Sequence, residues 1–338
     1  MNHLGLDMHS SHFVVAHVNA RGKFCRQYER ATTGEHLLDV VGQVRGPKRL
    51  VVEESHLAQW VKHIAEPFVD ELIICDPRRN RWISQDEFAD DRSSARKLAM
   101  LSHGGYLKAI RHPDQVGAEL RCLFLHYYML TRQTARFKNM LSATFRQVAI
   151  RAGGDDIYSS SERAVWLGKL KGFPALRHRA SQCFSLLDSL SLKKQQSFRR
   201  MLPRVRGSDT HKLLQTLPGV GPVTACGYQA LIDTPHRFSK KNKLWAYACL
   251  GNKYHESDRA VYASGPSKTG CRPLKWLVMQ QFNGAVQRAK ASNRFKRAYE
   301  HLLATGHGPK TARRQVCRSM LSAVRAVWMK GEAYRDVI

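Results

Sequence analysis

Acidic residues stand within or beside apolar segments at three places in the first third of the chain. Asp7 lies in HLGLDMH, Glu53 and Glu54 close RLVVEES, and Asp90 and Asp91 open DDRSSARKLAML. Burying a carboxylate beside apolar residues is costly unless it is paired or bound to a metal ion. Mg²⁺ takes oxygen ligands of this kind and keeps positions open for phosphate oxygens. The pattern therefore indicates a site for Mg²⁺ (or Mn²⁺) with Asp7, Glu54 and Asp91 as ligands. The alternative is that the three acids have structural roles only: Asp7 in a turn, Glu54 beside a helix N-cap, and Asp91 as a partner of a helix dipole.

The segment that begins at Asp91 is expected to be helical as far as residue 101 and to stop near the glycines at 104 and 105. On a helix, Asp91 and Ser94 are three residues apart and share one face. Two carboxylates at this spacing could share a metal ion, but a neutral serine hydroxyl is a poor Mg²⁺ ligand. A second carboxylate in place of Ser94 would add one negative charge to such a site. Asp90 does not simply supply that charge, because it is turned by about 100° from Asp91 around the helix.

Two serines lie in the stretch KYHESDRAVYASGPSKTG, which the sequence predicts to be a loop. Ser257 and Ser264 are flanked there by cationic side chains, including Arg259 and Lys268. Cations next to a serine hydroxyl could stabilise the charge of a phosphoryl transition state, so either serine is a candidate nucleophile. Because serine is common in loops, the chemistry alone leaves an ordinary loop serine as the alternative.

The stretch LPGVGPVTACG has the pattern of a helix-hairpin-helix turn, in which Gly219 and Gly221 let the backbone approach a phosphate. Free N–H groups at the start of the next helix would bind that phosphate without reading sequence. A plain turn between two helices is the alternative. Further phosphate contacts are expected downstream, from Lys240, Lys241, Lys243 and Lys268.

The charge of the chain is strongly uneven. Residues 1–115 carry 16 Lys and Arg against 15 Asp and Glu, whereas residues 116–338 carry 39 against 12, out of a net charge of +28. A polyanion removes the self-repulsion of such a surface, and counterion release makes the binding tight and salt-dependent. The charge therefore predicts a nucleic-acid partner; a ribosomal-type or merely very soluble basic protein is the alternative.

The chain is expected to be multi-domain, with an α/β part followed by all-α parts. Residues 1–115 alternate apolar strands with a helix, and residues 19–22 form the turn of a hairpin. Residues 116–204 form a helical arm, because apolar or neutral residues repeat there at heptad spacing for about three heptads. Either a coiled coil or an ordinary helical hairpin fits this arm. Residues 205–338 form a basic helical domain.

The eight cysteines form no C-x-x-C pair, so reduced and mostly buried thiols are expected. No apolar run approaches the roughly 20 residues that span a bilayer. The first residues, MNHLGLDMHS, show no signal-peptide pattern, so a cytoplasmic protein is expected.

Taken together, the motifs resemble those of the DEDD transposases of the IS one-ten family, in its IS eleven-eleven branch, which are related to the Piv DNA invertase. The resemblance covers nearly the whole chain, in two blocks. The first block holds GLDMHS, VVEESHLAQW, DPRRNRWI and DDRSSARKLAML; the second holds LLQTLPGVGPVTA, RFSKKNKLWAYACLG and ESDRAVYASGPSKTGCRPLKWLVMQ.

This resemblance implies an N-terminal RuvC-like domain of the RNase H fold, a coiled-coil arm and a C-terminal transposase domain. It implies DNA strand exchange through a serine that links covalently to DNA, helped by metal-binding acidic residues. The implied partners are double-stranded DNA (element ends and target), a non-coding bridge RNA, and further copies of the chain in a dimer or tetramer. The implied location is the bacterial nucleoid.

The residues implied by the resemblance follow the motifs. The acidic positions fall on Asp7, Glu54 and Asp91, with Ser94 at the fourth, and the nucleophile falls on Ser257. The family usually has Gly after that serine, whereas this chain has Asp258, so Ser264 is a second candidate. Arg78 and Arg79, in DPRRNRWI, are expected to contact nucleic acid.

Two other functions stay open at the level of sequence. One is a metal nuclease of the Holliday-junction type, in which water is the nucleophile and Ser257 is idle. The other is a degenerate nucleic-acid-binding protein without activity, which the missing fourth acid would explain.

Overall fold

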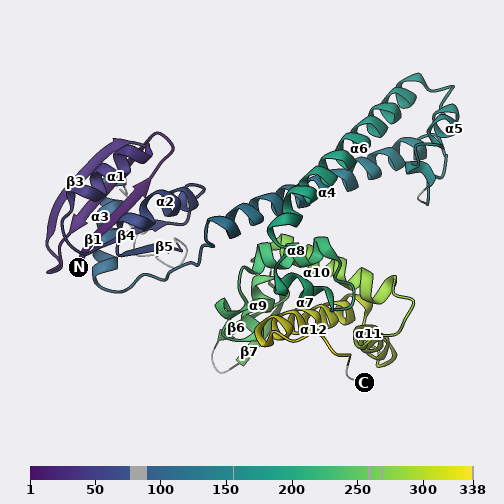
Figure 1. The fold of residues 1–338 in the computed structure, drawn as a ribbon. Helices are drawn as coiled ribbons and strands as arrows, with labels where there is room; N and C mark the ends of the chain where they lie inside the picture. Colours follow the sequence, from purple (N-terminus) through teal and green to yellow (C-terminus); the bar gives the residue numbers. More distant parts are fainter. Residues whose placement is uncertain (77–89, 155, 258–259, 268, 337–338) are drawn as a thin grey trace. The chain divides into compact units, whose positions relative to one another are not determined.

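The computed structural model describes residues 1–76, 90–154, 156–257, 260–267 and 269–336. The chain divides into two compact units, Met1–Ala118 and Glu119–Ile338. The first is an α/β unit and the second is mostly helical (Figure 1), as the sequence predicts. The finer division into 1–115, 116–204 and 205–338 stays a prediction.

The first unit is built on a five-stranded sheet in the order β3-β2-β1-β4-β5. Its strands are β1 (Asn2–Met8), β2 (His12–Val18), β3 (Phe24–Ala31), β4 (Lys48–Glu53) and β5 (Glu71–Cys75). β1 to β3 are antiparallel neighbours, whereas β4 runs parallel to β1 and β5 runs parallel to β4. The predicted turn at residues 19–22 is confirmed: the Gly22 N–H donates to the Asn19 carbonyl, with Gly22 at a φ of 77°.

Helices cover both faces of this sheet. α1 (Gly34–Gln43) and α2 (Ala58–Ala65) pack on the face that carries Leu4 and Leu6 of β1. α3 (Asp91–His103) packs on the opposite face. Because successive strand residues point to opposite faces, Gly5 faces α3. A Cβ on Gly5 would stand 2.1 Å from the Ala95 carbonyl oxygen, so the glycine lets α3 lie close against β1.

A long antiparallel helix pair opens the helical part of the chain. α4 (Gln115–Arg146) leads through the short α5 (Arg163–Gly168) to α6 (Pro174–Met201). Arg179 donates to Thr144 near one end of the pair, and Ser197 donates to the Leu123 carbonyl near the other. All seven predicted heptad positions are buried or half-buried: Leu120, Leu123, Tyr127, Leu130, Thr134, Phe137 and Leu141. The predicted helices are present; the arm as a separate part of the chain and its supercoiling stay predictions.

The remaining helices surround one apolar core. They are α7 (Asp209–Gln215), α8 (Pro222–Ile232), α9 (Lys241–Tyr247), α10 (Arg272–Phe282), α11 (Arg294–Ala304) and α12 (Pro309–Lys330). Leu120 and Phe124 of α4 and Met201 of α6 join the same core, so the base of the arm is packed into this helical body. Gly331, with a φ of 68°, ends α12 in the left-handed conformation that glycine favours.

One segment of this unit differs from the sequence-based expectation. The stretch predicted as a loop forms an antiparallel hairpin of β6 (Asn252–Ser257) and β7 (Ala260–Pro266), so the C-terminal part is not purely helical. The reason is local: aromatic and β-branched residues such as Tyr254, Val261 and Tyr262 favour strands over loops.

All eight cysteines are free thiols and six of them are buried, which confirms the expectation from their spacing. None of the described helices combines the length and the hydrophobicity that a bilayer crossing requires.

Candidate functional site

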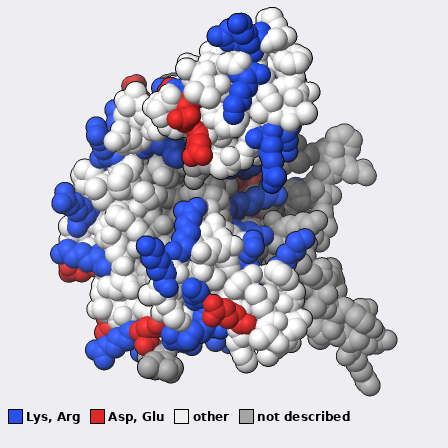
Figure 2. Space-filling view, turned by 90° about the vertical axis from the view of Figure 1, so that its right-hand side faces the viewer, with Lys and Arg blue, Asp and Glu red and all other residues white. Residues whose placement is uncertain are grey.

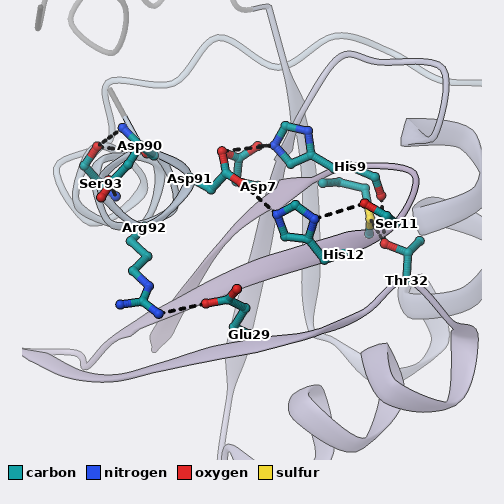
Figure 3. A network of polar contacts seen from close by, with 11 residues as sticks. Asp7, His9, Ser11, His12, Glu29, Thr32, Asp90, Asp91, Arg92 and Ser93 are labelled. Carbon is teal, nitrogen blue, oxygen red and sulfur yellow. Dashed lines mark hydrogen bonds and ion pairs between the residues drawn. The ribbon is translucent and has the colours of Figure 1, made fainter. Parts of the chain in front are cut away.

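Two of the three predicted metal ligands meet beside the C-terminal end of the central strand, β1, where a histidine joins them (Figure 3). Asp7 lies near the end of β1, and Asp91 is the first residue of α3. His9 Nε2 lies 3.6 Å from Asp7 Oδ1 and 3.3 Å from Asp91 Oδ1. One ligand atom from each of the three residues lies within 4.8 Å of the others, which is a spacing that could hold a metal ion. The donor set of two carboxylates and an imidazole fits a divalent cation such as Mn²⁺.

A second histidine holds one of these carboxylates in place. His12 Nε2 lies 2.8 Å from Asp91 Oδ2, while His12 Nδ1 lies 3.1 Å from the Ser11 hydroxyl. The tight turn between β1 and β2, in which the His9 N–H donates to the His12 carbonyl, places the two rings in a stack 5.2 Å apart. A neutral His12 can accept from Ser11 at one nitrogen and donate to Asp91 at the other, which would orient the carboxylate.

The start of α3 fixes the position of Asp91. Asp90 is the N-cap residue: its carboxylate accepts from the Ser93 N–H at 2.6 Å, and the Asp90 N–H donates to the Ser93 hydroxyl at 3.2 Å. Because the Asp90 carboxylate is bonded to the helix end in this capping box, Asp91 is the residue whose carboxylate lies in the cluster. The hydrogen bond from the Ser93 N–H lowers the pKa of Asp90. The structure thus agrees with the inference that Asp90 does not replace the missing acid.

Two carboxylates at this site have raised pKa values. Burial raises the pKa of Asp7, and the charge of Asp91 raises it further against the opposing effect of His9. Burial also raises the pKa of Glu53, with Asp7 as the second cause. Such shifts toward the neutral acid mark carboxylates that gain from a bound positive charge.

Glu53 and Glu54 lie on different sides of the end of β4. β1 and β4 pair in parallel up to Leu6 opposite Val52, so Glu53 follows Val52 on the strand next to Asp7. Val51, two residues earlier, packs against α3, so Glu53 shares the face of the cluster. The Glu54 carboxylate instead bonds to His112 Nε2, and the Nδ1 of that ring contacts Gln59. The structure does not bring Glu54 to Asp7 and Asp91.

Ser94 lies one turn along α3 from Asp91 and is half-buried. Its N–H donates to the Asp90 carbonyl as part of the first turn of the helix. The shared helix face expected from the spacing is therefore present.

The sequence did not identify His9, His12 or Glu53 as members of the site. The stretch DMHSSH carries the signal: His9 follows Asp7 by two positions at the end of a predicted strand, and the tight turn after it brings His12 beside His9. Only the register of the sheet, however, separates Glu53 from Glu54.

Other predicted site residues lie elsewhere. Ser257 ends β6 and Ser264 lies within β7, and both belong to the second unit. Arg78, Arg79 and Lys268 lie outside the described residues.

The glycine-rich turn joins α7 to α8, but its two glycines differ. A Cβ on Gly219 would stand 2.3 Å from the Gln281 carbonyl oxygen, and its φ is 75°, so this glycine serves close packing against the end of α10. Gly221 is the N-cap of α8 and has open space where a Cβ would stand. Only Gly221 therefore has the open surroundings that an approaching phosphate requires. The downstream cations Lys240, Lys241 and Lys243 are all exposed.

The basic character expected from the sequence is visible on the surface. Figure 2 shows one face of the molecule, on which Lys and Arg side chains outnumber those of Asp and Glu. This imbalance suits a polyanionic partner.

Comparison with known families adds an observation on the second unit. Residues 211–300 match the transposase IS116/IS110/IS902 family. The match runs from α7 into α11 and includes the glycine-rich turn, the three lysines near α9, and both candidate serines. No curated protein matches the chain. The match supports the IS110 family and a DNA-transposing enzyme in general terms. The Asp7–His9–Asp91 cluster lies outside the matched residues.

Proposed function

We propose that this chain is the transposase of an insertion sequence, a site-specific DNA recombinase that cuts and rejoins strands through a serine nucleophile aided by metal-binding carboxylates. The observation that carries the proposal is the match of residues 211–300 to an IS110-type transposase family. The Asp7–His9–Asp91 cluster in the other unit supports it with a second, independent feature.

Asp7, His9 and Asp91 would hold a divalent cation, Mg²⁺ or Mn²⁺, and Glu53 would add a carboxylate. Such a cation neutralises phosphate oxygens and stabilises the charge that develops when a phosphodiester is attacked. The residues of the chain have separate tasks. His12 orients Asp91 through its 2.8 Å contact, and the capping box at Asp90 fixes the first turn of α3.

The serine step conserves the number of phosphodiester bonds. The serine oxygen attacks a backbone phosphorus, a Ser–O–P bond forms, and the bond from phosphorus to one deoxyribose oxygen breaks. The serine proton leaves and the freed deoxyribose oxygen gains one. Attack by the hydroxyl of another strand reverses these changes and releases the serine, so rejoining needs no ATP. Ser257 is the proposed nucleophile and Ser264 the second candidate.

The rest of the proposal follows from the resemblance. The first unit would be a RuvC-like domain of the RNase H fold, since its carboxylates stand on a strand, at a strand end and at a helix start. A bridge RNA would select the DNA, two or four copies of the chain would assemble on the element ends and target, and the complex would act at the bacterial nucleoid. The basic arm and C-terminal part would hold RNA and DNA.

The test uses purified chain, the non-coding RNA encoded beside its gene, and labelled DNA carrying the element end. Wild-type chain is expected to form a covalent protein–DNA adduct that survives denaturation and carries a phosphoserine at position 257. Ser257→Ala is expected to abolish the adduct and the recombinant junction, with Ser264→Ala as the matched control.

Three results would contradict parts of this proposal. An adduct lost only in Ser264→Ala would move the nucleophile to Ser264. Metal-dependent cleavage that survives in the double serine variant would favour the Holliday-junction-type nuclease. Absence of any product that Ser94→Asp restores would identify a degenerate enzyme that keeps nucleic-acid binding alone.

A further inference from the structure

A large groove lies along the helical arm, where the arm meets α10. It has a volume of about 1030 Å³ and runs along α4 beside the C-terminal half of α10. Side chains from residues 128–139 form one wall, and Trp276, Gln280 and Arg288 form the other. All of these residues belong to the second unit.

The charge of the groove is of one sign. Four of its lining residues are cationic, and none of the described lining residues is Asp or Glu. Three of the cations, Arg132, Arg136 and Arg288, are exposed. The Lys138 ammonium lies 3.9 Å from the centre of the Tyr158 ring. Cations gathered in a hollow without acidic neighbours favour a polyanionic occupant.

Two aromatic side chains give the groove a fixed stacking surface. The rings of Tyr128 and Trp276 lie 5.1 Å apart at an angle of 60°, and the Arg132 guanidinium lies 6.0 Å from the centre of the Tyr128 ring. Both aromatics are half-buried and pack against the core of the unit, so they are held in place on one side while they line the groove on the other. A preformed aromatic surface binds a flat ring with little loss of side-chain entropy.

The polar side chains of the groove complete the chemistry. Gln133, Asn139 and Gln280 add amide groups that can both donate and accept hydrogen bonds, as base edges require. Bases stacked inside a duplex cannot lie on an aromatic ring, whereas unpaired bases can. We propose that this groove binds a single nucleic-acid strand, with a base against Trp276 and phosphates on Arg132, Arg136 and Arg288. This inference rests on one part of the proposed function, namely that the chain acts on nucleic acid.

The experiment measures binding by the full chain in chelator, where no strand is cut. Fluorescent RNA and DNA single strands of about 12 nucleotides, a length within the usual site size, are compared with a duplex of the same sequence. The test variants are the triple variant Arg132→Gln, Arg136→Gln, Arg288→Gln, and Trp276→Ala with Trp276→Phe as its conservative partner. The charge-matched control replaces three exposed lysines outside the groove: Lys171→Gln, Lys310→Gln and Lys330→Gln.

The triple arginine variant is expected to reduce the slope of log Kd against log salt by about 2, since each lost phosphate contact on a single strand contributes about 0.7. Trp276→Ala is expected to weaken single-strand binding roughly ten-fold, and Trp276→Phe to restore most of it. The lysine control is expected to change the slope less than the arginine variant. A preference for RNA or for DNA identifies which strand the groove holds, and either result supports the proposal.

Equal effects of the arginine and lysine variants on single-strand binding would overturn the proposal. It would also be overturned if Trp276→Ala weakened duplex binding as much as single-strand binding. If Trp276→Ala lowers Tm enough to unfold the chain, the arginine variant and Trp276→Phe decide the question. Failure here is separate from failure of the proposed function, because the Ser257→Ala adduct assay does not depend on the groove variants.

Discussion

His12 and Asp91 are 79 residues apart in the sequence, yet His12 Nε2 lies 2.8 Å from Asp91 Oδ2. The contact joins the first turn of the sheet to the first turn of α3. One carboxylate oxygen of Asp91 is engaged by His12, and the other lies 3.3 Å from His9. This arrangement resembles a metal ligand with a supporting residue behind it, a relationship that usually fixes ligand orientation.

His12→Ala should therefore weaken metal binding without removing a ligand. The expected loss in Mn²⁺ affinity is roughly ten-fold, the range typical of supporting residues, measured by titration calorimetry or by the spin-resonance signal of free Mn²⁺. His12→Gln, which can still donate to Asp91, should recover part of the affinity. His63→Ala, at an exposed position on α2, is the control. Wild-type affinity in His12→Ala would show that Asp91 needs no such support.

Asp7→Asn should raise the stability of the metal-free chain at neutral pH. Because the folded-state pKa of Asp7 is raised, chiefly by burial and then by Asp91, the folded chain holds that proton more tightly than the unfolded chain does. The corresponding stability is present below the unfolded pKa and is lost as pH rises through the raised folded pKa. The ionised carboxylate thus destabilises the metal-free fold at pH 7, and a neutral amide removes that cost.

Thermal unfolding measures this directly. In chelator, Asp7→Asn should show a higher Tm than wild type at pH 7 and a smaller difference in acid. With Mn²⁺ added, only the wild type should gain stability, since ligands that bind the folded state raise Tm. Asp39→Asn, at an exposed position on α1, is the control. A metal-induced rise in Tm that persists in Asp7→Asn would remove Asp7 from the ligand set.

The two neighbouring glutamates at the end of β4 should behave differently. Glu53 lies on the strand beside Asp7 and its pKa responds to the Asp7 charge, whereas Glu54 bonds to His112. Glu53→Gln should lower Mn²⁺ affinity by about ten-fold or more, while Glu54→Gln should mainly lower Tm by loosening the contact with His112. Calorimetry and thermal unfolding on both variants separate the effects. The opposite pattern would favour Glu54 as the ligand.

Ser94→Asp should strengthen metal binding. The new carboxylate would stand one turn from Asp91 on the same helix face and supply a negative charge that the site lacks. Mg²⁺, which prefers oxygen ligands, should gain more than Mn²⁺, and a several-fold gain is expected. Ser93→Asp is the informative control, because Ser93 belongs to the capping box with Asp90 and should cost stability instead. A fall in affinity in Ser94→Asp would indicate that the site needs a neutral group there.

Alanine variants of the two glycines in the α7–α8 turn should distinguish a packing role from a phosphate-binding role. Gly219→Ala should destabilise the chain by roughly 1–3 kcal/mol or more, because its Cβ would clash with the Gln281 carbonyl and its φ is 75°. Gly221→Ala should leave Tm nearly unchanged and weaken duplex DNA binding if the backbone there approaches a phosphate. Unfolding and DNA titration are measured on both variants. Equal DNA affinity for Gly221→Ala and wild type would favour a plain helix–helix turn.

The sequence by itself determined the elements and the charge. The strands of the sheet, the start and end of α3, the two long helices and the Gly331 cap follow from short-range patterns: alternation, 3.6-residue spacing and capping residues act within a few positions. For the segment of β6 and β7 the sequence predicts a loop, since serines and a glycine interrupt the strand-forming residues, but the segment pairs as two strands.

Only the tertiary structure decided how these parts combine. Docking of α3 on Gly5 brings Asp91 to Asp7, and the β1–β4 register selects Glu53 over Glu54 as the neighbour of Asp7. Gly219 packs closely against α10, and Trp276 of the same helix lies beside Tyr128 of the arm. These relationships join segments far apart in the chain, and a shift of one residue in register would exchange the faces of a whole strand.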